Sequence, residues 1–399
     1  MKILIFSKHF WPENFRINDI AEDLVKEGNE VSVITTYPHY PYKKLFKNFN
    51  DTYLKNKKIK IYRVPIIDFG KKYKIFIVLN YLSFIFTSFI LTPFYLLFQK
   101  FDVIFVFGTS PLIQGLSAIH LKYLFRSKLI TWVLDLWPDD LKSTGYISNN
   151  FILRINEYLS KILYFFSDKI LIQSNAFKEP INKLFKNNKT IYFPNPVDRF
   201  IFEESNRLRI KNKFNLSPLK FNITYAGNIG NNQSIDTIIE SINLISGEKS
   251  NIYFHFFGSG NKDKYLNEQL KDQINAKFYG LKELSEMKYA FEYSDAFLIS
   301  LADFPNLNKT VPGRVHTFMA AGKPILASCN GEAAKIILES KGGLVSAAEN
   351  ANLLKINILN LWNMSKEERD LIGNNGKVFA LNNYHPDSLM IKLQKIFKD

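Results

Sequence analysis

The sequence predicts an α/β protein made of two doubly wound domains with parallel sheets. The chain has 399 residues, more than one hydrophobic core usually sustains. Short apolar strands alternate with amphipathic helices along both halves, and a proline-containing break separates the halves at residues 192–202. Nearly continuous apolar strands rich in Val, Ile and Phe are typical of parallel sheets that helices cover on both faces.

The first domain is expected at residues 1–195. Its first helix, at residues 15–27, precedes a glycine, Gly28, where a C-terminal cap belongs. The apolar residues of this helix share one face: Ile17, Ile20, Ala21, Leu24 and Val25. The expected strands are KILIFS, EVSVITT, IKIYRVP, DVIFVFG, KLITWVLD and DKILIQS, with helical stretches between most of them.

The second domain is expected at residues 196–383 and repeats the pattern. Its strands are FNITYAG, NIYFHFFG, AKFYG, DAFLIS, KPILASC and GLVS. A last helix is expected at residues 384–399, and packing of this helix on the first domain is one of its alternatives. The chain is therefore two Rossmann-like domains in tandem. Open sheets of this kind bind ligands beyond the carboxyl ends of their strands, so we expect the two sheets to face each other across an interdomain cleft that holds the site.

Charge and cysteine content restrict the partners. The net charge of +15 favours anionic partners, but the lysines are scattered and no nucleic-acid-reading module occurs. Acidic lipid and phosphate-bearing substrates therefore fit better than nucleic acid. The only cysteine, Cys329, cannot form an intrachain disulfide, which is typical of a reducing cytosol. The N-terminal MKILIFSKHFWPEN is interpreted as a first strand rather than a signal peptide.

An apolar segment at residues 75–98 runs without a charge, and lysines flank it at 71, 72, 74 and 100. Its length suits a transmembrane helix, but a full span would put strands of one sheet on opposite sides of a bilayer. Asn80, Ser83 and Thr87 share one helical face, which leaves an aromatic face opposite. We expect residues 71–100 to lie on an anionic membrane surface, with Phe84, Phe86 and Phe89 toward lipid. A buried core helix is the alternative.

Several enzyme classes are set aside because their motifs are absent from the sequence. It contains no GxSxG elbow, P-loop, HExxH, metal-chelating D-x-D triplet or complete dinucleotide fingerprint, and its six histidines are dispersed. We therefore expect no cofactor and no metal ion.

Three glycine-bearing loops of the second half indicate a diphosphate site. AGNIGNNQS follows the first strand of that half and FGSG the second, and they contribute Gly227, Gly258 and Gly260. In VPGRVH, Gly313 and Arg314 stand at the start of another helix. Helix N-termini offer free N–H groups to anions, and the arginine fork suits phosphate oxygens. Each loop alone is also compatible with an ordinary βα turn, and Arg314 with pairing to a neighbouring carboxylate.

The stretches GNIGNNQSIDTIIES, FFGSG, FYGLKELSEMKYAFEYSDAFLISL and VPGRVHTFMAAGKPILASCNGEAAKII resemble, in order, the donor-domain motifs of the family 4 glycosyltransferases. The first-half stretches FWPENFRINDIAEDLVKEGNEVSVITTYPHYP and LDLWPDD resemble a subgroup that builds bacterial O-antigens and capsules and includes N-acetyl-L-fucosamine transferases. The resemblance implies the GT-B fold, a nucleotide-diphosphate sugar as donor and a lipid-linked saccharide as acceptor. It also implies a retaining, metal-independent course on the inner face of the cell membrane.

The resemblance also carries site residues. Arg314 is expected to hold the diphosphate while Val311 and Gly313 lie beside the nucleotide. The family usually has two glutamates, eight positions apart, where this sequence has Lys309 and Thr317. Basic residues of the first donor loop are replaced by Asn228 and Gln233, and the histidine before Asp135 by Leu134. Lys309 is therefore expected to help meet the diphosphate charge, and Glu332 is the substitute hydroxyl acceptor.

On the acceptor side, Asp135 and Glu13 are the candidate base or positioning groups, and His9 is a further catalytic candidate. For both carboxylates a helix cap or turn role is the alternative, and for His9 a packing role. The remaining acceptor-binding candidates are Asn14, Arg16, Tyr37, His39 and Trp137. The aromatic loop TYPHYP either stacks on sugar faces or forms a rigid loop.

Two other functions remain open from the sequence. A sugar-nucleotide epimerase on the same scaffold would need no lipid acceptor, so the apolar segment argues against it. A non-catalytic membrane scaffold is compatible with the missing glutamates.

Overall fold

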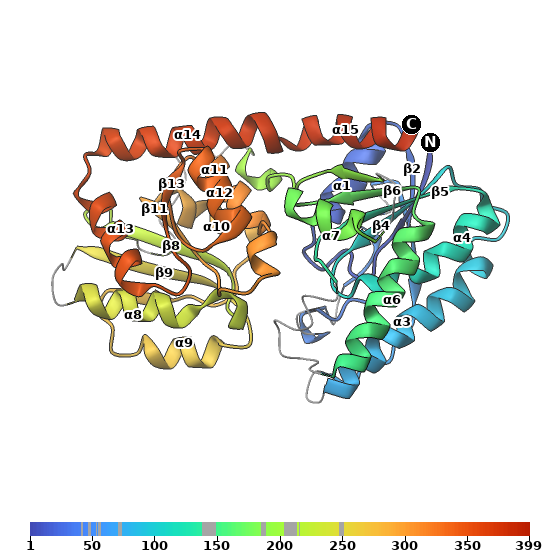
Figure 1. Cartoon of the computed structure of the whole chain (residues 1–399), viewed down its shortest axis with the longest axis horizontal. Coiled ribbons are helices and arrows are strands. Elements are labelled where there is room, and N and C mark those ends of the chain that lie inside the picture. Colours follow the sequence, from blue (N-terminus) through green and yellow to red (C-terminus); the bar gives the residue numbers. More distant parts are fainter. Residues whose placement is uncertain are drawn as a thin grey trace. The chain divides into compact units, whose positions relative to one another are not determined.

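The computed structural model describes residues 1–40, 43–46, 49–52, 54, 57–70, 74–137, 149–184, 189–202, 214, 216–246 and 251–399. It forms two compact units, Met1–Pro194 with Asp387–Asp399, and Asn195–Pro386 (Figure 1). Three parts of the sequence argument lie outside the described residues: Lys71 and Lys72, the end of LDLWPDD, and most of residues 203–215.

The first unit is built on a seven-stranded, wholly parallel sheet in the order β3-β2-β1-β4-β5-β6-β7. Six of these strands coincide with the predicted apolar runs, and the short seventh was not predicted. Their bounds are β1 Lys2–Phe6, β2 Glu30–Thr36, β3 Ile59–Val64, β4 Val103–Gly108, β5 Lys128–Val133, β6 Lys169–Ile172 and β7 Thr190–Tyr192.

Helices cover both faces of this sheet, each over its own apolar cluster. Helices α1 (Ile17–Lys26) and α15 (Pro386–Lys398) pack on one face. The other face carries α3 (Lys74–Tyr95), α4 (Ser117–Phe125), α6 (Asn150–Phe166) and α7 (Lys178–Asn182), together with the 3₁₀ helices η2 (Leu112–Leu116) and η3 (Asn175–Phe177). A further 3₁₀ helix, η1, spans Lys43–Phe46. The first unit is therefore completed by the last helix of the chain.

Helix α3 contains the apolar segment and is long and apolar enough, over Phe76–Tyr95, to cross a membrane. Its polar face binds the backbone just before it: Asn80 donates to the carbonyl of Ile67, Ser83 accepts from the Ile67 N–H, and Thr87 donates to the carbonyl of Pro65. Phe84 is fully buried against Phe6, whereas most aromatic residues further along the helix are exposed. The expectation that Phe84 faces lipid is therefore wrong.

The second unit has a six-stranded parallel sheet in the order β10-β9-β8-β11-β12-β13. All six strands were predicted: β8 Phe221–Asn228, β9 Ile252–Ser259, β10 Ala276–Phe278, β11 Ala296–Ser300, β12 Ile325–Ser328 and β13 Gly343–Ser346. One face carries α8 (Ile235–Ser246), α9 (Asp263–Gln269) and α13 (Ala351–Asn363). The other carries α10 (Leu284–Glu292), α11 (Gly313–Ala320), α12 (Gly331–Glu339) and α14 (Lys366–Tyr384). The short 3₁₀ helices are η4 Arg199–Ile201, η6 Asn231–Gln233 and η7 Leu307–Lys309.

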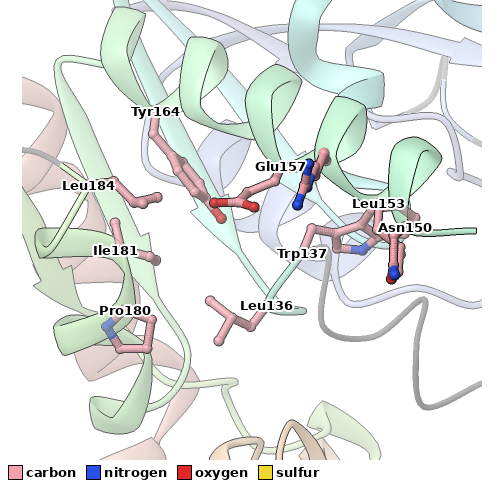
Figure 2. A pocket seen from close by; sticks show the side chains of 10 residues that line it. Leu136, Trp137, Asn150, Leu153, Glu157, Tyr164, Pro180, Ile181 and Leu184 are labelled. Atoms are coloured by element: carbon pink, nitrogen blue, oxygen red, sulfur yellow. The ribbon is translucent and has the colours of Figure 1, made fainter.

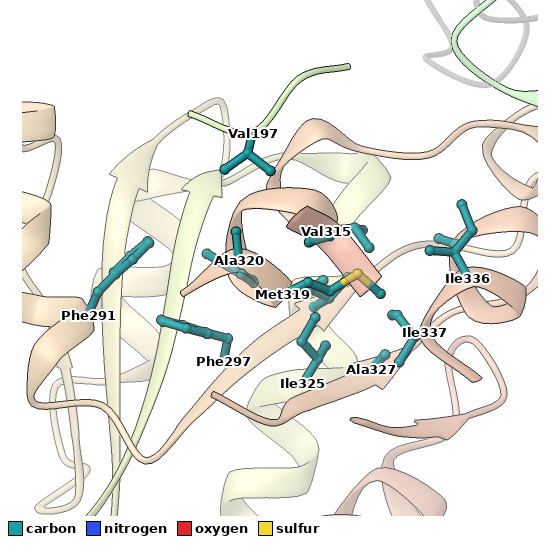
Figure 3. Close-up of a cluster of buried hydrophobic side chains, with 14 of the residues drawn as sticks. Val197, Phe291, Phe297, Val315, Met319, Ala320, Ile325, Ala327, Ile336 and Ile337 are labelled. Atoms are coloured by element: carbon teal, nitrogen blue, oxygen red, sulfur yellow. The ribbon is translucent and has the colours of Figure 1, made fainter. Parts of the chain in front are cut away.

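Helix α11 is anchored by its apolar residues. Figure 3 shows Val315, Met319 and Ala320 directed into the cluster that Ile325 and Ile337 also enter. The helix ends at Ala320, and Gly322 then adopts a left-handed φ of 74° before the chain enters β12. The Ala-Gly-Lys-Pro corner therefore returns the chain to the sheet, and the buried helix holds its first turn, with Arg314, at the sheet's carboxyl edge.

Candidate functional site

In the second unit, Arg314 lies at the carboxyl ends of β8 and β11. Its Nη1 donates to the Tyr225 hydroxyl at 2.9 Å and its Nη2 to the Ser300 carbonyl at 3.4 Å. Its Nε is buried and has no hydrogen-bond partner in the part of the chain that the structure describes. No carboxylate there pairs with the guanidinium either, so the alternative of an ordinary ion pair is not supported. An arginine with a buried donor left over is suited to bind an anion.

Tyr225 fixes the position of the arginine. Its hydroxyl donates to the carbonyl of Asn228 at 2.5 Å and so offers its lone pairs to Arg314. The guanidinium carbon lies 5.1 Å from the centre of the Tyr225 ring. Burial raises the pKa of Tyr225, and the Arg314 charge opposes that rise, so the phenol remains protonated at neutral pH. Neither Tyr225 nor Ser300 was predicted as a site residue, because both are ordinary members of apolar strands.

The loop glycines have a packing role. A Cβ on Gly227, whose φ is 148°, would lie 2.6 Å from Nη1 of Arg314. A Cβ on Gly258 would lie 1.8 Å from the Gly227 carbonyl oxygen, and one on Gly260 would lie 2.1 Å from that of Ile229. Gly258 and Gly260 are therefore required by the contact between two neighbouring loops, and Gly227 by the approach of the arginine.

The other donor-side candidates lie around these loops. Asn228 donates to the Gln233 side chain at 2.9 Å, so these two residues bind each other. Val311 is buried, and Gly313 opens α11. The remaining two candidates lie on neighbouring elements: Lys309 closes η7, and half-buried Glu332 lies in the first turn of α12.

Thr317, at a position where the resemblance predicts a glutamate, has a carboxylate partner. Its hydroxyl donates to Oδ2 of Asp198 at 2.6 Å. His316, beside it, is fully buried, stacks on Tyr384 with ring centres 3.8 Å apart, and bonds through Nδ1 with the carbonyl of Asn195. His316 therefore has a structural role. Asp198 supplies a carboxylate next to Thr317, where the resemblance predicted a glutamate.

In the first unit, the fold brings His9, Glu13 and His39 together beyond the ends of β1 and β2. Glu13 is buried; its Oε2 lies 2.6 Å from Nδ1 of His9, and its Oε1 accepts the backbone N–H groups of His39 and Tyr40. Burial alone would raise the pKa of Glu13, but the hydrogen bond and charge of His9 and the two N–H groups lower it. Glu13 is therefore an ionised acceptor that fixes Nδ1 of His9 as the donor.

His39 has a pKa lowered to about 4, first by burial and then by the charges of His9 and Lys8. It is therefore neutral at physiological pH. The ring of His9 stacks between those of Phe15 and His39, with centres 4.9 and 5.2 Å away. This packing orients the imidazole of His9, which is buried.

These three residues also form a group that could hold a metal ion, because one ligand atom from each lies within 4.8 Å of the others. The dispersal of histidines in the sequence is therefore no argument against such a group, and that part of the sequence argument is wrong. Both carboxylate oxygens of Glu13 already accept hydrogen bonds, which a bound ion would have to displace.

Asp135 follows β5 and connects two loops. Its Oδ2 accepts from the Ser110 N–H at 3.0 Å and from the Ser110 hydroxyl at 2.7 Å, and Trp137 donates through Nε1 to the same hydroxyl at 2.9 Å. Burial raises the pKa of Asp135, although both Ser110 bonds act in the opposite direction. The carboxylate is thus a turn-stabilising group with a raised pKa, which keeps both sequence interpretations open.

The remaining acceptor-side candidates differ in exposure. Asn14 and Tyr37 are exposed, Arg16 precedes α1 and is half-buried, and Trp137 is buried. Trp137 lines a pocket of about 510 Å³ between α6 and α7 (Figure 2). The pocket was not predicted, because the residues that form it come from three separate segments of the chain.

Part of the second unit is similar to a known protein family. Residues 220–364 match the family described as Glycosyl transferases group 1. The probable glycosyltransferase WbjE of Pseudomonas aeruginosa is 26% identical over 234 residues, which are 55% of this chain and 56% of that protein. The chain thus spans about half the length of that relative.

Solved structures that resemble the whole chain include the following two. The alignment with the sucrose-phosphate synthase of Thermosynechococcus elongatus covers 100% of this chain and 98% of that protein, at 13% identity and a TM-score of 0.78. The HepE protein of Anabaena, solved in complex with UDP, covers 100% of both chains at 13% identity and a TM-score of 0.72. At such identities the structures show the fold alone, and the expected GT-B fold is confirmed.

Proposed function

We propose that this chain, which has the GT-B fold, transfers a sugar from a nucleotide diphosphate to a polyprenyl-diphosphate-linked saccharide. The premise is that residues 220–364 match the group 1 glycosyltransferases. The proposed pathway is the assembly of O-antigen or capsule. The proposed donor is a UDP-sugar that carries N-acetyl-L-fucosamine or another N-acetylated amino sugar. The acceptor-side motifs that resemble the N-acetyl-L-fucosamine subgroup support the sugar, and the UDP complex of HepE supports the carrier.

The observation that carries the proposal is the unused buried donor of Arg314. The guanidinium lies beside Gly227, at the edge of the sheet where ligands of doubly wound domains bind. A diphosphate oxygen there would satisfy this group. The same positive fork would stabilise the negative charge that grows on the departing phosphate.

The proposed reaction is a retaining displacement. The acceptor oxygen bonds to the anomeric carbon, the bond from that carbon to the diphosphate breaks, and the hydroxyl proton passes to the departing phosphate. His9 is proposed to orient the acceptor hydroxyl, and Glu13 is a positioning residue that holds the imidazole through Nδ1. In this proposal these steps need neither a cofactor nor a metal ion.

The proposed location is the cytoplasmic face of the cell membrane, with residues 71–100 on anionic lipid. Exposed aromatic residues support this proposal: Phe86 and Phe94 of α3 have exposed fractions of 67% and 71%, and Phe98, just after the helix, has one of 97%. Exposed apolar side chains of this kind suit contact with lipid, and the net charge of +15 favours an anionic surface.

The test is to incubate purified protein with a panel of radiolabelled nucleotide sugars and a polyprenyl-diphosphate-linked saccharide, with and without a chelator. We expect label in the lipid extract, undiminished by the chelator. Conversion of the free nucleotide sugar alone would show an epimerase instead. Neither product across the panel would support a non-catalytic scaffold, and loss of transfer with the chelator would refute the metal-independent course.

A further inference from the structure

We propose that the pocket between α6 and α7 binds the hydrocarbon chain next to the phosphates of the lipid-linked acceptor. The assignment to an acceptor rests on the proposed function, whereas the chemistry of the pocket does not. The pocket is lined by Leu136, Trp137, Asn150, Leu153, Arg154, Glu157, Tyr164, Pro180, Ile181 and Leu184. It lies beyond the carboxyl ends of β5 and β6, because Leu136 and Trp137 directly follow β5 and α7 follows β6.

Seven of the ten lining residues have apolar or aromatic side chains, and Asn150, Arg154 and Glu157 are polar. Leu136, Trp137, Leu153 and Ile181 are all less than a tenth exposed, and the ring of Tyr164 forms a further wall. Figure 2 shows the leucine and isoleucine side chains and the tyrosine ring facing a common space, with the Tyr164 hydroxyl directed toward the Glu157 carboxylate. The apolar side chains would contact an aliphatic or isoprenoid chain, while the polar ones stand ready for a charged or hydrogen-bonding end of the same molecule.

The charged residues of the pocket favour an anion at one end. Arg154 is exposed and makes no hydrogen bond or ion pair with any residue that the structure describes. Glu157, one turn further along α6, pairs with Lys161 at 2.7 Å, so its negative charge is compensated. Among the described residues that line the pocket, the uncompensated group is therefore the guanidinium of Arg154, and a guanidinium binds phosphate oxygens well. An apolar slot with an arginine at its edge fits a molecule with a hydrocarbon chain and a phosphate.

The exposed surface of α6 carries a second apolar stripe. Phe151, Ile155, Tyr158 and Phe165 have exposed fractions of 71%, 42%, 65% and 61%, and their spacing places them on one side of the helix. This stripe lies about 140° around the helix from Leu153 and Glu157, which face the pocket. Helix α6 also covers the same face of the sheet as α3. In this proposal the outer apolar side of the helical layer holds the part of the lipid chain that lies outside the pocket.

The pocket is also connected to a candidate catalytic group. Trp137 forms part of its wall and donates to the Ser110 hydroxyl, which in turn donates to Asp135. Filling the pocket would press on this indole and so on the raised-pKa carboxylate. The phosphate end of the lipid would then lie near the edge of the sheet, where the sugar of the acceptor has to be presented.

The test uses farnesyl diphosphate, a soluble isoprenoid diphosphate, in calorimetry on the full chain with saturating UDP to occupy the donor side. We expect binding at least tenfold tighter than that of inorganic pyrophosphate or farnesol alone. Leu184→Trp, which fills the pocket from a half-buried position, and Arg154→Glu should each weaken farnesyl diphosphate binding at least tenfold. Lys264→Glu, the same charge change on exposed α9, should not. Melting temperatures check that each variant is folded.

Equal affinity for farnesyl diphosphate in folded Leu184→Trp and wild type would overturn the proposal, as would equal affinity for pyrophosphate and farnesyl diphosphate. The test of the pocket and the test of the proposed function can fail independently of each other. If the lipid binds and no sugar is transferred, the pocket stands and the function fails. If sugar is transferred and Leu184→Trp leaves the KM for the lipid acceptor unchanged, the function stands and the pocket fails.

Discussion

At the scale of residues, Arg314 shows what a sequence can and cannot predict. Its position at a helix start after a glycine indicated an anion-binding role. Its supports, the Tyr225 hydroxyl and the Ser300 carbonyl, come from strands β8 and β11, and only the strand order brings these together. The same holds for Glu13, whose contacts with His39 and Tyr40 span a distance along the chain that no local pattern encodes.

Replacing Arg314 with Ala should weaken UDP binding by about 10- to 100-fold, because a charge-assisted hydrogen bond of this kind contributes about 1.5–3 kcal/mol. Arg314→Lys keeps the charge but loses the planar fork, so we expect an intermediate loss. Calorimetric titration with UDP measures both effects, and thermal unfolding of the same samples controls for folding. UDP affinity equal to that of the wild type in folded Arg314→Ala would remove this residue from the donor site.

At the scale of elements, α3 has one side buried in the core and another side exposed. Asn80, Ser83 and Thr87 do share a face, as predicted, but that face binds the backbone of residues 65–67. The aromatic residues do not form one face: Phe84 enters the core, while Phe86 and Phe94 are exposed. Hydropathy alone could not separate them, because nearly every residue of the segment is apolar.

This division predicts opposite results for two sets of substitutions. Phe86→Ser with Phe94→Ser should release the protein from anionic liposomes in a flotation assay and change the melting temperature little. Phe84→Ala should lower the free energy of unfolding by about 3 kcal/mol and leave flotation unchanged. Unchanged flotation of the exposed pair would refute membrane contact through α3.

At the scale of the whole molecule, the sequence predicted the GT-B fold and twelve of the thirteen strands in the described residues, because buried parallel strands have continuous apolar sequences. It missed the three-residue strand β7, which is half-buried and too short to form such a run. It also left the partner of the last helix open. The apolar stripe of a helix shows that the helix is covered, but the covering surface is set by the tertiary fold.

The structure packs α15 onto the first unit, and this gives a prediction for stability. Leu393 is fully buried in the cluster over β1 and β4, whereas Ile391 on the same helix is 70% exposed. Leu393→Ala should destabilise the first unit by about 3 kcal/mol, and Ile391→Ala by less than about 1 kcal/mol. Calorimetric scanning should show the first unit's transition moving while that of the second stays. Equal shifts for the two substitutions would contradict this packing.

The return of α15 has a consequence for the order of events during synthesis. A ribosome that has released residues 1–194 has delivered the described strands of the first sheet and helix α1, but not α15, which shares one face of that sheet with α1. The part of this face that α15 covers stays apolar and exposed until the second unit and then α15 have emerged. The nascent chain therefore carries an open hydrophobic surface while residues 195–386 are made, the period in which a chaperone or the membrane itself would have reason to hold it.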